Sequence, residues 1–144
     1  MRLPSQPGEW IDRSRPLEFR FEGGAVQGFA GDTISSALWA QGLRTLGRSF
    51  KYHRPRGLLS FANHDANVVL QQGERLNIRA DVTEPEPSAQ LTAVNTFGGL
   101  QRDRAAVLDR LSAVLPVGFY YKAFYTRRLF PMWERMFRRL TGLG

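Results

Sequence analysis

Residues 17–42, LEFRFEGGAVQGFAGDTISSALWAQG, indicate how the fold begins. From Leu17 onward, apolar and polar residues alternate, which is the period of a half-buried strand. Gly23 and Gly24 can supply the positive φ angles of a tight turn, and residues 25–30 then form the return strand. The stretch therefore predicts a β-hairpin at the start of a domain.

The same stretch predicts a short helix after the hairpin. Asp32 can act as the N-cap, because its carboxylate can accept hydrogen bonds from the free amides of the first turn. Ile34, Ala37 and Leu38 have the i, i+3, i+4 spacing of a buried stripe. Gly42 can end the helix in a left-handed conformation, so a helix of about three turns is expected.

Further strands are expected in the second half of this domain. They are residues 67–71, a segment carrying Leu76 and Ile78, and residues 91–94, the last as an edge strand. Residues 84–87, EPEP, break any regular element. A hairpin, a helix and further strands packed against that helix describe a small α+β roll.

The last third of the chain has a different character. A helical stripe is expected over residues 107–115, and an aromatic cluster follows at residues 119–125. A final helix is expected to begin near Pro131, a residue that suits the first turn of a helix. Its apolar face comprises Leu129, Met132, Trp133, Met136, Phe137 and Leu140. A boundary between the two parts is expected between residues 87 and 99.

Composition excludes several classes of site. The 144 residues contain no cysteine, which excludes disulfides, thiolate zinc sites and an iron–sulfur cluster held by thiolates. No apolar run approaches the ~20 residues of a membrane span, and the first residues lack the apolar segment of a secretory signal, so the cytoplasm is expected. Lone histidines and scattered carboxylates form no nucleophile–base pattern, so the chain by itself is not expected to catalyse a reaction.

The distribution of positive charge along the chain indicates that it binds partners. The net charge of +7 falls mainly on residues 101–144, which hold nine basic residues against three acidic ones. Residues 47–57, GRSFKYHRPRG, hold four Arg or Lys residues, one histidine and no acid. The candidate site residues are Arg48, Lys51, Arg54 and Arg56, as a loop that faces a phosphate or docks a partner protein. A solvated basic loop and a nucleic-acid-binding module are the alternatives, since single-strand binders also interleave aromatic and basic residues.

Several segments together resemble one family. They are residues 11–17, IDRSRPL; residues 31–42, GDTISSALWAQG; the basic stretch; and residues 115–122, LPVGFYYK. In order and spacing they are similar to the amino-terminal part of the alpha subunit of heterotetrameric sarcosine oxidase. This resemblance implies a β-grasp, ferredoxin-like domain over residues 9–95 and a helical arm over 96–144 that leads towards a dinucleotide-binding domain.

The resemblance also implies a function. The complete enzyme demethylates sarcosine oxidatively with FAD, FMN and NAD, while this chain holds no Gly-rich fingerprint for a dinucleotide. We expect a non-catalytic structural or assembly module of such a flavoprotein complex, with a flavin-carrying beta subunit and the nucleotide-binding part of alpha as partners. Whether it is a split subunit or a fragment of a longer alpha chain stays open.

A [2Fe–2S] cluster is not expected despite the ferredoxin-like fold. The cysteine spacing of a plant-type ferredoxin, C-x4-C-x2-C, would fall on Ser60, Asp65 and Val68 in the loop over residues 58–68. None of these three is a soft ligand. The expected module is therefore cluster-free, and no metal ligands are assigned.

Overall fold

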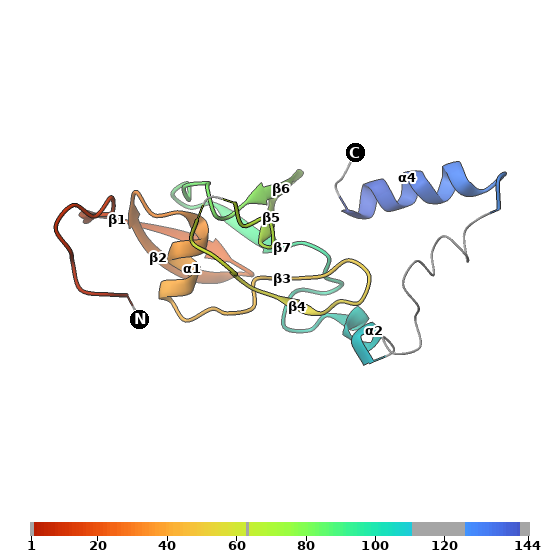
Figure 1. Cartoon of the computed structure of the whole chain (residues 1–144), viewed down its shortest axis with the longest axis horizontal. Coiled ribbons are helices and arrows are strands. Elements are labelled where there is room, and N and C mark those ends of the chain that lie inside the picture. Colours follow the sequence, from red (N-terminus) through yellow and green to blue (C-terminus); the bar gives the residue numbers. More distant parts are fainter. Residues whose placement is uncertain (1, 63, 111–125, 142–144) are drawn as a thin grey trace.

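The computed structural model describes residues 2–62, 64–110 and 126–141, without the side chains of residues 137–141. Its elements, labelled in Figure 1, are β1 (Asp12–Phe21), β2 (Gly24–Ala30), α1 (Ile34–Ala40), β3 (Gly47–Arg48), β4 (Pro55–Arg56), β5 (Val69–Gln72), β6 (Arg75–Arg79), β7 (Gln90–Ala93), the 3-10 turn η1 (Arg104–Ala106), α2 (Val107–Arg110) and α4 (Phe130–Thr141). The expected aromatic cluster at residues 119–125 and most of the helix expected over 107–115 lie outside the described residues.

Five strands form one mixed sheet in the order β2-β1-β7-β5-β6. Neighbouring strands are antiparallel except β1 and β7, which run parallel. Strand β7 therefore lies at the centre of the sheet, and the expectation of an edge strand there was wrong. Its alternation buries Leu91 and Ala93 on one face, but alternation gives no information on how many neighbours a strand has.

The opening hairpin forms as expected, with its turn shifted by one residue. Phe21 pairs with Gly24, so the turn is Glu22-Gly23, with φ angles of 51° and 82°. A glutamate rarely adopts such a positive φ. The Glu22 carboxylate accepts hydrogen bonds from the amides of Ala93 (2.7 Å) and Leu100 (2.8 Å), and these contacts fix the turn against distant parts of the chain.

Helix α1 covers one face of the sheet, and its buried stripe is as expected. It is shorter than expected, at seven residues, and Thr33 rather than Asp32 is its N-cap in a capping box with Ser36. Gly42 follows the helix with a φ of 84°, the left-handed conformation expected there. The core between helix and sheet consists of Phe19, Phe21, Val26, Ile34, Ala37, Leu38, Leu46, Val68, Leu70, Ile78, Ala80, Ala89, Leu91, Ala93 and Leu100.

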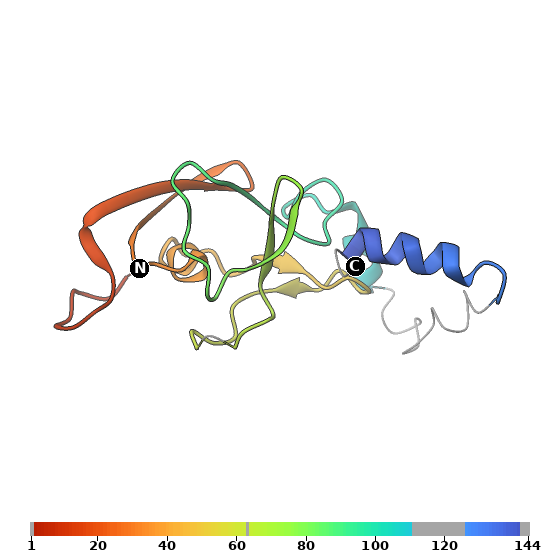
Figure 2. The same cartoon turned by 90° about the horizontal axis from the view of Figure 1, so that it is seen from above.

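Residues beyond β7 return to this core. Leu100 is buried among the core residues, and Asp103 is buried beside the short β3–β4 pair. In Figures 1 and 2 the β3–β4 pair lies between α1 and α2. The basic stretch is thus part of the folded body, between α1 and the segment that follows β7.

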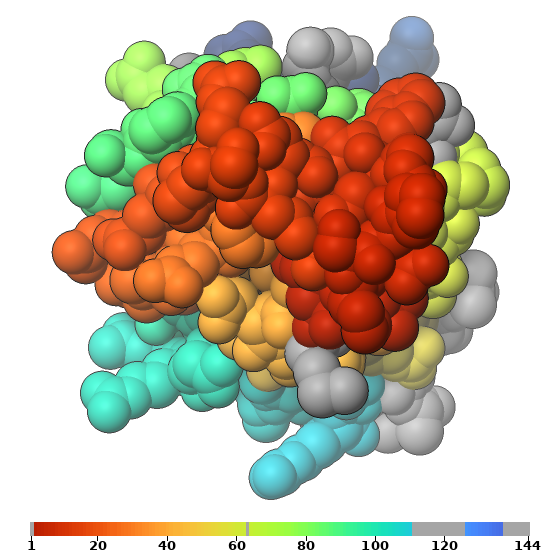
Figure 3. All heavy atoms as spheres, turned by 90° about the vertical axis from the view of Figure 1, so that its left-hand side faces the viewer, coloured from red at the N-terminus to blue at the C-terminus, as the bar shows by residue number. Residues whose placement is uncertain are grey.

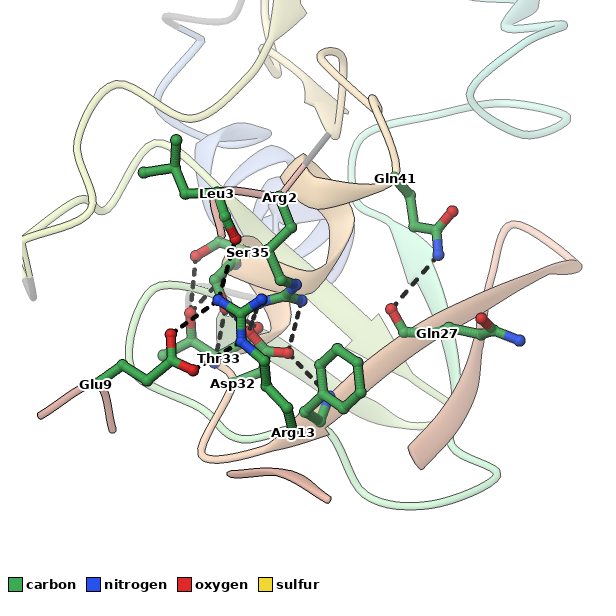
Figure 4. Close-up of polar contacts among 11 residues, drawn as sticks. Arg2, Leu3, Glu9, Arg13, Gln27, Asp32, Thr33, Ser35 and Gln41 are labelled. Atoms are coloured by element: carbon green, nitrogen blue, oxygen red, sulfur yellow. Dashed lines mark hydrogen bonds and ion pairs between the residues drawn. The ribbon is translucent and has the colours of Figure 1, made fainter. Parts of the chain in front are cut away.

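The N-terminal segment packs over the beginning of α1. The guanidinium of Arg2 holds the fully buried Asp32 carboxylate in a bidentate pair of 2.7 and 2.9 Å, and Arg13 pairs in the same bidentate way with Glu9. Figure 3 shows the N-terminal residues, in red, spread over this face, and Figure 4 shows the contacts. Gly31 lies directly under this segment, since an added Cβ would approach the Trp10 carbonyl oxygen to 2.3 Å.

Candidate functional site

The basic stretch forms a small hairpin whose tip turns on His53. Gly47 pairs with Arg56 and Arg48 with Pro55. Between the strands, the His53 amide donates to the Ser49 carbonyl at 2.9 Å, and His53 has a φ of 51°. The turn therefore bends the imidazole back into the body, where it is 3% exposed.

The buried imidazole forms a hydrogen bond with a carboxylate from a distant segment of the chain. Nδ1 of His53 donates to Oδ2 of Asp103 at 2.8 Å, and Nε of Arg48 lies 3.3 Å from the same oxygen. Oδ1 of Asp103 accepts from the amides of Phe97 and Ala105. Burial alone would raise the pKa of Asp103, but the amide of Phe97, His53 and the amide of Ala105 together hold it below its ordinary value.

The His53–Asp103 pair is structural in its geometry. A histidine that acts as general base needs a path to a substrate proton, whereas this ring is buried and packs beside Phe97, with 5.6 Å between the ring centroids. No local sequence pattern indicates this pair, because 50 residues separate its members.

The four candidate cations do not converge on one point. Arg48 lies inward, with Nη1 donating to the His53 carbonyl at 2.7 Å. Lys51 and Arg54 both lie over the Tyr52 ring, 4.6 and 4.7 Å from its centroid. Arg54 also pairs with Asp109 of α2 at 3.2 Å through exposed side chains. Arg56 donates to the side chain of Asn67 at 2.6 Å.

The loop after β4 is organised by another buried carboxylate. Oδ2 of Asp65 accepts from the amides of Leu59 (2.7 Å) and Ser60 (3.0 Å), and Oδ1 accepts from the amide of Asn67 (2.8 Å). Burial alone would raise the pKa of Asp65, but the three amides, of which Asn67 contributes most, lower it below its ordinary value. The loop borders an open hollow of about 410 Å³, lined by Arg56, Leu59, Ser60, His64, Asp65, Ala66 and Asn67.

Large apolar side chains are exposed around this loop and on α4. Leu59 and Phe61 are 81% and 60% exposed, and the Phe61 ring meets Trp39 of α1 edge to face at 5.8 Å. On the expected apolar face of the last helix, Leu129, Met132 and Met136 are exposed. The side chains of Phe137 and Leu140, also expected on that face, lie outside the described residues.

Among the residues described, no helix is both long and apolar enough to cross a bilayer. In the same part of the chain, no group of three His, Cys, Asp or Glu side chains could hold a metal ion.

Comparison with protein families matches residues 14–96 to the 2Fe-2S iron-sulfur cluster binding domain. The chain belongs to this family. It is also homologous to sarcosine oxidase alpha subunits. It is 42% identical to the alpha subunit from Rhizobium meliloti (strain 1021) over 99% of this chain and 15% of that protein. It is 34% identical to that from Corynebacterium sp. (strain U-96) over 76% of this chain and 11% of that protein.

The chain thus spans about a sixth or less of the length of these relatives. Among solved structures, the L-proline dehydrogenase of P. horikoshii has a TM-score of 0.48 and 20% identity over 57% of this chain and 16% of that one. The mixed sheet with few helices agrees with the α+β class expected for a ferredoxin-type domain.

Membership of a cluster-binding family raises the question of whether these residues fit a cluster. They do not. The chain has no cysteine, Val68 is buried in the hydrophobic core, and the Asp65 carboxylate is already occupied by three backbone amides. Ser60 uses its hydroxyl oxygen to accept from the amide of Ala62. No iron–sulfur chemistry can therefore be assigned to these side chains.

Proposed function

We propose that this chain is a non-catalytic structural and assembly module, or split subunit, of a sarcosine-oxidase-like complex. Such a complex would demethylate sarcosine or a related secondary amine oxidatively, in the cytoplasm. The observation that carries the proposal is 42% identity to a sarcosine oxidase alpha subunit along almost the whole chain. The chain corresponds to only 15% of that protein, and the proposal assigns the flavin and nucleotide chemistry to other parts of the complex.

The absence of a catalytic role for this part is supported by its own residues. Both titratable groups of the buried pair, His53 and Asp103, are shielded from solvent by the fold. A flavin-dependent oxidation needs a carrier of electrons, and the described residues contain no group of three His, Cys, Asp or Glu side chains that could hold a metal ion. FAD, FMN and NAD are expected in the complete complex, on the flavin-carrying beta subunit and the nucleotide-binding part of alpha.

We keep the division into a β-grasp domain at 9–95 and a helical arm at 96–144 as a proposal. Leu100 and Asp103 pack with the body, so the first residues of the proposed arm belong to the folded domain. The exposed apolar residues of α4 support a docking role for the arm, because leaving such side chains in water is costly and invites association. A partner subunit or the nucleotide-binding part of alpha would cover them.

The candidate phosphate-facing loop also stays a proposal, centred on Lys51 and Arg54. These two cations lie over the same aromatic ring, and Arg54 also pairs with Asp109. Arg48 lies inward on Asp103, and Arg56 donates to Asn67. A phosphate of FMN or NAD, or a carboxylate of a neighbouring subunit, would suit them. For the alternative function, nucleic-acid binding, salt-dependent affinity for a random oligonucleotide is the discriminating measurement.

The experiment is replacement in a relative. The matching segment of the Rhizobium meliloti alpha subunit is deleted, and the remainder is expressed with its partner subunits, with and without this 144-residue chain. We expect the deletion to impair assembly, and we expect this chain to co-purify with the flavin-containing subunits and restore sarcosine oxidation. The chain alone should oxidise no sarcosine with an artificial acceptor and should show no iron-dependent absorbance.

A second variant tests the exposed face of α4. A chain with Leu129 and Met132 changed to Ser should still fold but should restore less sarcosine oxidation than the unchanged chain. The proposal fails if the deleted enzyme assembles and works without the segment. It also fails if this chain neither binds nor restores activity, or if the isolated chain reduces the acceptor in the presence of amine.

A further inference from the structure

The 57–68 loop has an unusual centre for an exposed connection, namely a carboxylate that is itself buried. Asp65 is 4% exposed, yet its two oxygens face three backbone amides. Two of the amides, of Leu59 and Ser60, lie in the first part of the loop, and that of Asn67 lies in the last part. One side chain therefore joins both ends of the loop.

Converging backbone amides form a concavity that attracts anions, and such concavities hold phosphates and iron–sulfur clusters in other proteins. In this chain the concavity contains an anion that belongs to the chain itself. The family that the chain belongs to binds a cluster, while the chain has no thiolate with which to hold one. The amides are nevertheless gathered around one negative charge.

The surroundings hold this arrangement in place. The Asn67 side chain donates to the Gly57 carbonyl at 2.6 Å and accepts from Arg56 at 2.6 Å. Gly57 lies close to the backbone of Arg44, since a Cβ added to Gly57 would lie 2.1 Å from the Arg44 carbonyl oxygen. Val68, at the end of the loop, is anchored in the hydrophobic core. The loop ends are thus fixed, and the Asp65 carboxylate fills the space between them.

We propose that Asp65 is a built-in anion that occupies an amide-lined anion site, so that the loop folds without any metal or external ligand. Removal of this side chain opens a site for a small carboxylate from solution. Because two amides meet one oxygen and one amide meets the other, a planar anion with two oxygens fits the site and a spherical halide fits it less well. This role concerns the chain alone and is independent of the complex in which it works.

The test is chemical rescue of Asp65→Ala in the full chain, with sodium formate as the probe and sodium chloride at equal ionic strength as the reference. We expect the variant to melt several degrees below the wild type. We expect the Leu59, Ser60 and Asn67 amides to lose about ten-fold or more of their protection from hydrogen exchange. Formate should restore both properties in a saturable way, and chloride should not.

The matched control is Asp109→Ala, which removes a carboxylate that is about half exposed and that pairs, among the residues described, with Arg54. Formate should change its melting temperature no more than it changes that of the wild type. The proposal is overturned if formate acts equally on both variants and the wild type, or if Asp65→Ala loses neither stability nor amide protection.

If Asp65→Ala does not fold, the variant is refolded in formate and in chloride. The proposal predicts that soluble chain is recovered in formate and not in chloride. The wild type supplies an independent measurement. Its Leu59, Ser60 and Asn67 amides should be protected at neutral pH, and free exchange of these three amides in the wild type would overturn the proposal whatever the variants do.

Discussion

The hairpin at residues 47–56 and the loop at residues 57–68 are neighbours in the chain, and each is held by one buried aspartate. For the loop, the aspartate is Asp65, which lies within the segment that it organises. For the hairpin, it is Asp103, which follows His53 by 50 residues. The loop can therefore be shaped by local contacts, whereas the hairpin is completed only when the chain returns after β7.

The two aspartates also differ in the groups that they hold. Within the described part of the chain, the hydrogen bonds of Asp65 all come from backbone amides, so they do not depend on the identity of the neighbouring side chains. Asp103 binds two amides and also the side chains of His53 and Arg48. Removal of Asp103 would leave the buried His53 ring without its acceptor and the inward Arg48 without its counter-charge, which is more costly than the loss of a hydrogen bond that water can replace.

The largest effect is therefore expected for Asp103→Ala. It removes the acceptor of His53 and the counter-charge of Arg48, and we expect the free energy of unfolding to fall by about 3 kcal/mol or more. Urea unfolding followed by tryptophan fluorescence measures the loss. Asp103→Asn, which keeps one acceptor oxygen, should lose less. A loss below that of Asp109→Ala, the exposed neighbour on α2, would contradict the dependence of the hairpin on the returning chain.

Acid should weaken both regions, and this is the next largest effect. The pKa values of Asp65 and Asp103 are lowered in the folded chain. Each aspartate contributes stability fully above its unfolded pKa of about 3.9, and this contribution is lost as pH falls through the lower folded pKa. We expect the free energy of unfolding to be flat above about pH 5 and to fall steeply below about pH 4.

The difference in the free energy of unfolding between the wild type and Asp103→Asn tests this prediction for one of the two aspartates. It should be constant from about pH 5 to pH 7 and shrink below about pH 4, because the wild type then loses the interaction that the variant already lacks. Urea titrations at a series of pH values measure it. A difference that grows on acidification would mean that the folded-state pKa of Asp103 is raised above its unfolded value and not lowered.

Sequence alone predicted the regular part of the molecule well, because alternation and helical spacing depend on the side chains of the element itself. The alternation after Leu17 predicts that Phe19 and Phe21 share a face, and both are buried, as is the stripe of α1. The position of β7 in the sheet was not predicted, since it depends on pairing with β1 and β5. The turn at Glu22 was missed for a related reason, because its carboxylate is held by amides from residues 93 and 100.

The candidate site was predicted less completely. The basic stretch was recognised by its charge, but charge does not reveal direction, and Arg48 lies inward on Asp103 while Arg54 faces solvent. Asp65 was noted only as a position unsuited to iron. That it would bind three amides depends on the path of the loop, which no local pattern in the sequence describes.

A smaller effect is expected from the outer contact of the loop. Asn67→Ala removes the hydrogen bond to the Gly57 carbonyl and the acceptor of Arg56. We expect a loss of about 1 kcal/mol, because Arg56 is exposed and water can replace the latter contact. The Asn67 amide should still bind Asp65, so hydrogen exchange at residues 59 and 60 should change little. If those amides lose protection as fully as in Asp65→Ala, the side chain of Asn67 shapes the loop as much as the carboxylate does.

The smallest effect is expected at the outer edge of the hairpin, where Arg54 pairs with Asp109. Both side chains are about half exposed, at 55% and 44%, so water and salt screen the pair and Arg54→Ala should cost about 0.5 kcal/mol or less. A double-mutant cycle with Asp109→Ala at low and high salt measures the coupling, which should shrink as salt is added. The contrast with Asp103 lies in burial, since both aspartates face cations of the same hairpin. A coupling above about 2 kcal/mol that resists salt would show that α2 holds the hairpin as firmly as Asp103 does.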